Sequence, residues 1–335
     1  MDSLTQILLG AAVAAAIAPP RHRRAALLAG AALGTLPDLD SLPIALLTDD
    51  PVALMTLHRG ASHSLFVLPL LGWLIWALFR RLGGRAAESP KRWFWAIQLV
   101  LLTHPLLDAL TVYGTQLLWP LPLPPVMWSS VFIIDPLYTI WLLPACVAAF
   151  FLRERAAAQR ALAMGLVLST AYLGWSLVAK GMVEREAGRA LAAMGLADAP
   201  RFSVPTPFNT LLWRVVAMTP EGYVEGFRSL PADKGPMVFQ GHRSNTQALA
   251  GARDIAAVRQ LAWFNHGFMR AQVVDGELVL SDLRMGVEPD YFFSYAVARR
   301  EGDGWQAIEP PRKIDPRRDF GPVWRATWRR IWHEP

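Results

Sequence analysis

Long apolar stretches alternate with short polar ones over the first 180 residues. The apolar stretches predict six helices, at about 4–18, 25–36, 64–81, 93–112, 136–152 and 161–180. The last four approach the roughly 20 residues that a helix needs to cross a bilayer. The second is short and ends at Pro37-Asp38-Leu39-Asp40, which indicates a hairpin that stops at a covered polar pocket. We therefore predict an α-helical polytopic membrane domain of about six helices over residues 1–182.

The region after about residue 202 follows a different pattern, in which apolar and polar positions alternate in short runs. Three pairs of runs flank turn sequences: 211–218 with 223–227, 261–274 with 278–283, and 292–299 with 305–308. Such pairs are typical of β-hairpins, and Asp275-Gly276 is a strong hairpin turn. We predict a mostly antiparallel β extramembrane domain over residues 202–335, joined to the helices by a linker or amphipathic helix at 183–201.

Composition supports a membrane protein. Hydrophobic residues make up 53% of the 335 residues and charged residues 18%, against about 25% charged in soluble domains. The net charge is +6, and the positive charges of the first half fall in short clusters between apolar segments, which favours membrane topology over nucleic acid. Membrane lipids are therefore the expected partners, nucleic acid is not, and the sequence identifies no protein partner.

Positive charge also predicts the direction of the helices. The loops after the first, third and fifth helices hold clusters of cations: Arg21, Arg23 and Arg24; Arg80, Arg81, Arg85, Lys91 and Arg92; Arg153, Arg155 and Arg160. The opposite loops, 37–63 and 113–135, hold only Arg59. Basic loops stay in the cytoplasm, so the opposite loops and the tail should face the periplasm. The first segment has no cation before its apolar stretch, so we expect a retained helix instead of a cleaved signal peptide.

Three polar clusters in the apolar half could carry chemistry. They contain Asp38 and Asp40, then His58, Arg59 and His63, then His104 and Asp108. The predicted topology brings all three to one membrane face. Imidazole and carboxylate bind Zn²⁺, Mn²⁺ or Fe²⁺ without thiolate, and the lone Cys146 lies in an apolar run. The residues His104 and Asp108 are four apart, so they share a helix face.

This pattern predicts a divalent metal site, with zinc as the first expectation and manganese or iron as alternatives. The expected ligands are His58, His63, His104, Asp108 and Asp38. Asp38 or Asp40 is expected as general base, and Arg59 as the group that binds an anionic substrate. The surplus of ligands fits either two ions or one ion plus a base.

Each element also has a structural interpretation. Asp38 and Asp40 could end a helix, His104 could bond only to Asp108, and Arg59 could pair with an Asp. Asp135 before Pro136 is typical of a helix N-cap, and Ser3 with Gln6 fits a capping box.

Four stretches together resemble the YdjM-type family of inner-membrane metal-dependent hydrolases: Met1–Gln6, Gly34–Asp40, His58–Ser64 and Leu102–Asp108. The resemblance covers roughly residues 1–180. It implies a bacterial inner-membrane protein with several spans, and its matching polar residues are Asp38, Asp40, His58, His63, His104 and Asp108. One departure is Gln6, where many relatives carry His, so a ligand there would be lost or replaced by a weaker amide oxygen.

The expected function is that of a membrane-bound metal-dependent hydrolase that uses metal-activated water on a lipid or lipid-linked phosphoester. An ion or metal transporter is one alternative, because intramembrane His and Asp also mark ion pathways. The sequence has no internal repeat of the kind that many transporters show. A non-catalytic membrane scaffold is the other alternative.

Overall fold

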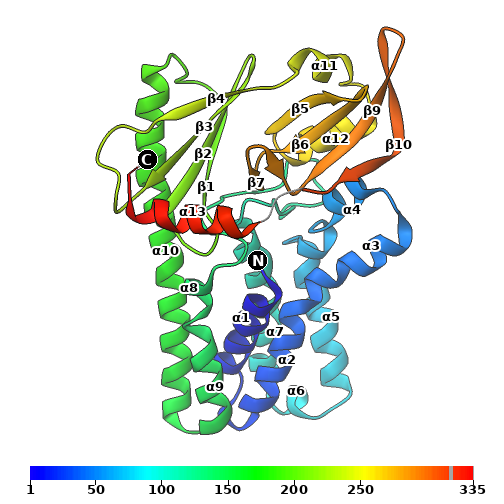
Figure 1. Ribbon diagram of the computed structural model, residues 1–335. Helices are drawn as coiled ribbons and strands as arrows, with labels where there is room; N and C mark the ends of the chain where they lie inside the picture. Colours follow the sequence, from blue (N-terminus) through cyan, green and yellow to red (C-terminus); the bar gives the residue numbers. More distant parts are fainter. Residues whose placement is uncertain (317–319, 335) are drawn as a thin grey trace. The chain divides into compact units, whose positions relative to one another are not determined.

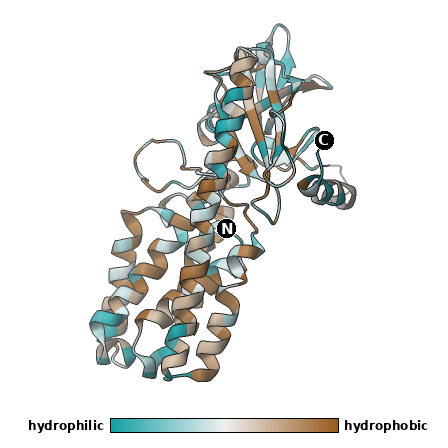
Figure 2. Ribbon diagram, turned by 90° about the vertical axis from the view of Figure 1, so that its left-hand side faces the viewer, coloured by the Kyte–Doolittle hydropathy of each residue, from teal (hydrophilic) through white to brown (hydrophobic). Residues whose placement is uncertain are grey.

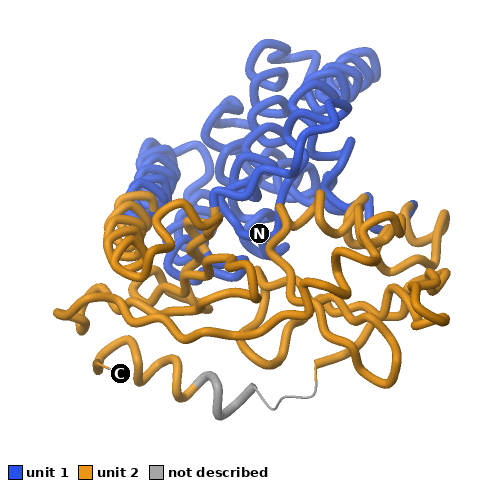
Figure 3. The backbone as a smooth tube through the Cα atoms, turned by 90° about the horizontal axis from the view of Figure 1, so that it is seen from above, with its two compact units in different colours: residues 1–43, 58–128, 132–176 blue, residues 44–57, 129–131, 177–335 orange. Residues whose placement is uncertain are grey.

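The computed structural model describes residues 1–316 and 320–334, and the chain divides into two compact units (Figure 3). Unit 1 comprises Met1–Pro43, His58–Trp128 and Phe132–Ser176. Unit 2 comprises Ile44–Leu57, Ser129–Val131 and Leu177–Pro335. The first unit holds the helical region and the second the antiparallel sheets, so the predicted order of a helical region followed by β structure is confirmed.

Unit 1 consists of helices and short 3₁₀ turns (Figure 1). The elements that start in it are α1 Ser3–Ile17, η1 Pro20–His22, α2 Arg23–Thr35, η2 Leu36–Asp40, α3 Ser41–Leu47, η3 Ala61–His63, α5 Val67–Arg81, α6 Arg85–Glu88, α7 Pro90–Ala109, α8 Pro136–Thr139, α9 Leu142–Leu152 and α10 Ala156–Ala193. The helix predicted at 136–152 is two helices. Pro144 has no N–H to donate to the carbonyl of Ile140, so one bond of the helical ladder is missing where the two helices separate. Asp135 caps α8 by accepting from the Leu137 amide, which confirms the predicted cap.

Helices α1 and α2 pack with their backbones in close contact. A Cβ added at Gly30 would lie 2.2 Å from the Gly10 carbonyl oxygen, and one at Gly34 would lie 2.4 Å from the Gln6 carbonyl oxygen. Small residues allow this approach in helix pairs of membrane proteins. Because the contact leaves no room for side chains, it fixes the level at which Gln6 and Gly34 face each other.

The outer surface of unit 1 is apolar in many places, as the hydropathy colouring in Figure 2 shows. Leu70, Trp73 and Leu74 on α5 are each more than half exposed. By length and hydropathy, the described residues contain one helix that could cross a membrane, α10. A second candidate is the pair Pro51–His63 and Val67–Arg81, which is bent by 58°. The number of about six spans therefore stays a prediction.

Unit 2 contains two four-stranded antiparallel sheets and one short strand pair. The first sheet has the order β1-β2-β3-β4 and the second the order β10-β9-β6-β5. The elements are α4 Pro51–Leu57, β1 Arg201–Pro205, β2 Leu212–Thr219, β3 Gly222–Ser229, β4 Phe239–Arg243, α11 Thr246–Gly251, α12 Ala256–Phe264, β5 Met269–Val274, β6 Glu277–Asp282, β7 Gly286–Val287, β8 Asp290–Tyr291, β9 Ser294–Glu301, β10 Gly304–Ile314 and α13 Phe320–Trp332. The three predicted hairpins are confirmed as β2–β3, β5–β6 and β9–β10.

One predicted strand was wrong at its start. The run 261–274 was expected to be extended, but α12 reaches Phe264 and β5 begins only at Met269. The buried residues of α12 are Val258, Leu261 and Phe264, whose spacing of three places them on one helix face. A short apolar run does not by itself distinguish a strand from a buried helix.

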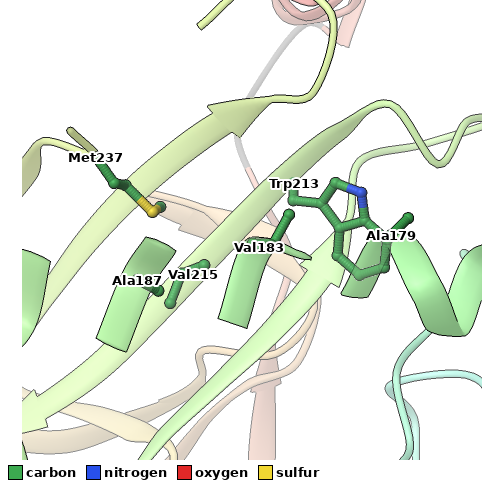
Figure 4. Close-up of a cluster of buried hydrophobic side chains, with 6 residues drawn as sticks. All are labelled: Ala179, Val183, Ala187, Trp213, Val215 and Met237. Atoms are coloured by element: carbon green, nitrogen blue, oxygen red, sulfur yellow. The ribbon is translucent and has the colours of Figure 1, made fainter. Parts of the chain in front are cut away.

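The last turns of α10 form part of the core of unit 2 (Figure 4). Ala179, Val183 and Ala187, each four residues apart, pack against Trp213, Val215 and Met237. The segment predicted as a linker or amphipathic helix at 183–201 thus begins as a continuation of α10.

A polar cluster lies beside this core. The Nζ atom of Lys180 lies 3.1 Å from Ser129 Oγ and 2.8 Å from Ser203 Oγ. Ser203 in turn donates to Glu184. Segment 129–131 is thereby bonded to both α10 and β1.

Candidate metal centre

Three elements of unit 1 bring four of the predicted ligands together. Asp38 lies on η2, which follows α2, and His63 ends η3. His104 and Asp108 lie one turn apart on α7. One ligand atom from each of the four residues lies within 4.8 Å of all the others. Residues scattered over some seventy positions of the sequence therefore converge on one point.

Five of the six separations among these atoms are close to the edges of a tetrahedral ligand set. His63 Nε2 lies 3.1 Å from His104 Nε2, 3.3 Å from Asp38 Oδ1 and 3.3 Å from Asp108 Oδ2. His104 Nε2 lies 3.4 Å from Asp38 Oδ1 and 3.6 Å from Asp108 Oδ2. Bonds of about 2.0–2.1 Å from a central ion give tetrahedron edges of about 3.3–3.4 Å. The side chains therefore already stand at the separations that one divalent ion requires.

The same carboxylate oxygens lack hydrogen-bond donors among the described residues, although Arg59 Nε lies 3.2 Å from Asp108 Oδ2 as an ion pair. Within the described residues, Asp38 Oδ1 and Asp108 Oδ2 are buried and accept no hydrogen bond. Buried polar atoms are nearly always paired, so two orphaned oxygens that point at two imidazoles fit a cation. Burial raises the pKa of Asp38, but the imidazoles of His104 and His63 beside Oδ1 outweigh that effect and hold the pKa well below its usual value. The carboxyl is thus ionised, as a ligand must be.

The outer atoms of the ligands are fixed by hydrogen bonds. His104 Nδ1 lies 2.7 Å from the Gly34 carbonyl oxygen, which can only accept, so Nδ1 carries the proton. His63 Nδ1 lies 2.9 Å from Ser62 Oγ. Asp108 Oδ1 accepts from Gln6 Nε2 at 3.0 Å and from the Met1 amine. Such contacts set the tautomer and orientation of metal ligands, and here they turn both Nε2 atoms inward.

His58, which was predicted as a ligand, lies outside the group of four. Its Nδ1 lies 2.6 Å from Asp40 Oδ1, and Asp40 also accepts from the Arg59 amide and the Ser62 hydroxyl. Burial raises the pKa of Asp40, but the bonds from His58 and Ser62 outweigh this effect, so the pKa lies below its usual value. The result is an imidazole–carboxylate pair whose ring centroid lies 6.0 Å from that of His63.

Arg59 reaches the site from a strained backbone. Its φ is 64°, a conformation that non-glycine residues adopt mainly where function requires it. Its Nε lies 3.2 Å from Asp108 Oδ2, and its guanidinium lies 4.9 Å from the centroid of the Tyr113 ring. The pairing of Arg59 with an Asp, left open by the sequence, is therefore present, and it adds a positive charge at the ligand oxygen.

A comparison with protein families now bears on this site. A family model described as YdjM inner membrane protein matches residues 1–183, more than half of the chain. The chain belongs to the YdjM family. No match to a curated protein or to a solved structure reaches significance. All four convergent residues, the His58–Asp40 pair and Arg59 fall within the YdjM region, so the protein is an inner-membrane family member with a candidate metal centre.

Two residues of this YdjM protein differ from their predicted roles. The capping box of Ser3 and Gln6 was wrong, because Asp2 caps α1 by accepting from the Thr5 amide. Gln6 instead lies buried beside the site and donates to Asp108. The available signal was a single amide in an otherwise apolar helix, which sequence reasoning interpreted as a lost ligand.

Proposed function

We propose that this protein is a membrane-bound metal-dependent hydrolase. The observation that carries the proposal is the four-atom set of His63, His104, Asp38 and Asp108, whose atoms lie within 4.8 Å of one another, with its two carboxylate oxygens left without hydrogen bonds. Two imidazoles and two carboxylates suit Zn²⁺ best, with Mn²⁺ or Fe²⁺ as alternatives. The two carboxylates would balance the charge of one divalent ion.

The ligands are not equally enclosed. His63, His104 and Asp108 are at most 1% exposed, whereas the Asp38 side chain is 18% exposed. Catalytic zinc sites commonly use three protein ligands and leave the fourth position to water or substrate. We infer that the three enclosed side chains are permanent ligands, and that Asp38 is the ligand that substrate would displace.

The His58–Asp40 pair supplies a group for proton transfer. A divalent ion bound here would lower the pKa of a bound water and stabilise charge on a phosphoryl oxygen. Asp40 fixes the imidazole of His58 by holding Nδ1–H, which leaves Nε2 as the proton acceptor. His58 is partly exposed, and its Nε2 has no hydrogen bond within the described residues. We assign His58 the role of general base and Asp40 that of its orienting partner.

Arg59 indicates the kind of substrate. It lies beside Asp108 and holds a fixed positive charge at the centre, which favours an anionic group such as a phosphoester. The substrate should therefore be anionic and accessible from the membrane. A lipid or lipid-linked phosphoester has both properties.

The contacts of unit 1 support an outward-facing site and several spans. Loops rich in cations meet at one end, where Arg24 donates to the Phe150 carbonyl and Arg21 pairs with Glu88. The ligands lie at the opposite end of α2 and α7. With the basic loops in the cytoplasm, we propose that the metal centre lies at the periplasmic face and that α1, α2, α5, α7, α8–α9 and α10 are embedded in the membrane.

A second candidate is a non-catalytic membrane scaffold stabilised by metal. The observation in its favour is the presence of four protein ligand atoms, since structural zinc sites are closed by four protein ligands. A metal transporter gains no such support, because the described residues contain a single group of this kind and not a series along a pathway.

The test is metal content and turnover of the full chain purified in detergent. We expect one ion per chain in the wild type, and loss of that ion in His63→Ala and in His104→Ala. The matched control is His333→Ala, at an exposed imidazole far along the sequence, which should keep the ion. Turnover is measured on a chromogenic phosphodiester and on phospholipid vesicles.

Asp38→Asn separates the two candidates. A hydrolase in which Asp38 is displaced by substrate should retain the ion in this variant with reduced affinity, and the wild type should turn over phosphoester. A wild type that holds metal but turns over neither substrate would favour the scaffold candidate. An ion content that neither His variant changes would refute the assignment of a metal centre to these residues.

A further inference from the structure

Helix α13, near the end of unit 2, has two dissimilar faces. Ile331 is 1% exposed, and its carbonyl accepts from Ser229 at the end of β3. Arg330 forms an ion pair with Asp233. These contacts attach one side of α13 to the first sheet, so the orientation of the helix on unit 2 is set by the protein itself.

The other face of α13 combines tryptophan and arginine. Trp328 is 49% exposed and Trp332 is 53% exposed, and they are one helical turn apart. Arg325 and Arg329 are exposed as well, and are likewise four residues apart. Residues separated by three or four positions share a helix face, so these four side chains form one surface, the Trp–Arg face.

This combination matches the chemistry of a membrane surface. Tryptophan collects at the level of the lipid headgroups, and arginine is attracted to anionic lipids by charge. A helix that lies in the interface typically presents both kinds of residue. Nucleic acid would require the charge but not two exposed indoles. The chain is already an inner-membrane protein, so a bilayer is within reach of unit 2.

We propose that the Trp–Arg face of α13 binds the phosphate headgroups of the bilayer and holds unit 2 against an anionic membrane surface. The tryptophans lie among the headgroups, and the two arginines contact lipid phosphates. The proposal does not depend on the metal centre, and it holds whether or not the protein is a hydrolase.

The test uses the full chain in reconstituted vesicles with a single fluorescent label. Cys146→Ser removes the one native cysteine, and His333→Cys provides an attachment point for a polarity-sensitive dye next to the Trp–Arg face. Vesicles contain either phosphatidylcholine alone or phosphatidylcholine with phosphatidylglycerol. Lipids that carry a quencher at the headgroup report contact.

We expect at least twofold stronger quenching in the phosphatidylglycerol vesicles than in phosphatidylcholine, and a loss of that difference in 0.5 M salt or so, where charges are screened. Arg325→Gln with Arg329→Gln should remove the difference, and Trp328→Ser with Trp332→Ser should reduce quenching in both lipids. The matched control is Arg253→Gln with Arg300→Gln, two exposed cations elsewhere on unit 2, which should behave as the wild type.

Three results would overturn the proposal. They are equal quenching in both lipid compositions, a dye that remains water-exposed in both, and a control pair that weakens quenching as much as the α13 pair. Each variant is first checked for an unchanged elution volume and helical signal, so that a misfolded protein is not scored.

Discussion

Gly34→Ala is expected to weaken metal binding although Gly34 is not a ligand. The new Cβ would lie 2.4 Å from the Gln6 carbonyl oxygen. Ordinary van der Waals contact begins near 3.4 Å, so α2 must move away from α1 by about 1 Å, as both contacting groups are backbone. The Gly34 carbonyl oxygen holds His104 Nδ1 at 2.7 Å and would move with the helix.

The magnitude follows from the function of that bond. Loss of a partner that orients a metal ligand typically costs about 10–100-fold in metal affinity, which corresponds to about 1.4–2.7 kcal/mol. The assay is competition for the ion between the purified protein and a chromogenic chelator. Circular dichroism and elution volume in detergent report whether the helices remain folded.

Two glycine variants serve as controls for this prediction. A Cβ at Gly174 on α10 would contact nothing within 4 Å, so Gly174→Ala should leave metal affinity unchanged. Gly30→Ala creates a similar clash one turn away, at 2.2 Å from the Gly10 carbonyl oxygen, but Gly30 does not bond to His104. If Gly34→Ala binds metal as tightly as the wild type, or no more weakly than Gly30→Ala at equal stability, the role assigned to the Gly34 carbonyl is wrong.

Three further outcomes are expected. Asp40→Asn should retain the ion but lose about 10²–10⁴-fold in turnover, the usual contribution of acid–base catalysis. Asp49→Asn, at an exposed position between α3 and α4, should be neutral, and steady-state kinetics with metal analysis measures both variants. Chelation of the ion should lower the midpoint temperature of unfolding, because an ion present at 100 times its Kd stabilises the folded protein by about 2.7 kcal/mol. Added metal should restore that midpoint. Lys180→Met should lower the free energy of unfolding by about 1–3 kcal/mol, because it leaves buried oxygens of Ser129 and Ser203 without the Lys180 donor. Denaturant unfolding measures this loss, and Arg185→Met, at an exposed position, should show none.

The convergence of the ligands could be predicted because residue type and topology point the same way. Pro37 has no N–H to donate to the helical ladder, and α2 indeed ends at Thr35, just before the 3₁₀ turn η2 that carries Asp38. The spacing of His104 and Asp108 on one helix needs only the helical repeat. Arginine clusters in alternate loops predicted that Asp38 and the pair of His104 and Asp108 lie at the same end of the helices. Each step used local chemistry that remains true in the folded chain.

The role of His58 could not be predicted in this way. The residue with positive φ in this loop is Arg59 and not its neighbour Gly60. A left-handed Arg59 turns His58 toward Asp40 and Arg59 toward Asp108. No propensity favours arginine in that conformation, so the proposed division between ligand and base depends on tertiary contacts that the sequence does not reveal.

The hydrogen bond at Gly34 also helps to explain why the four atoms are suited to a cation. Because the Gly34 carbonyl accepts the Nδ1 proton of His104, the lone pair of His104 lies on Nε2, 3.1 Å from Nε2 of His63. Two carboxylate oxygens without hydrogen bonds face the same point. A single proton between the imidazoles would leave the oxygens unpaired, whereas a divalent ion satisfies all four atoms at once. Metal binding at this candidate centre would therefore depend on the close packing of α1 and α2, which positions the Gly34 carbonyl, as much as on the four side chains themselves.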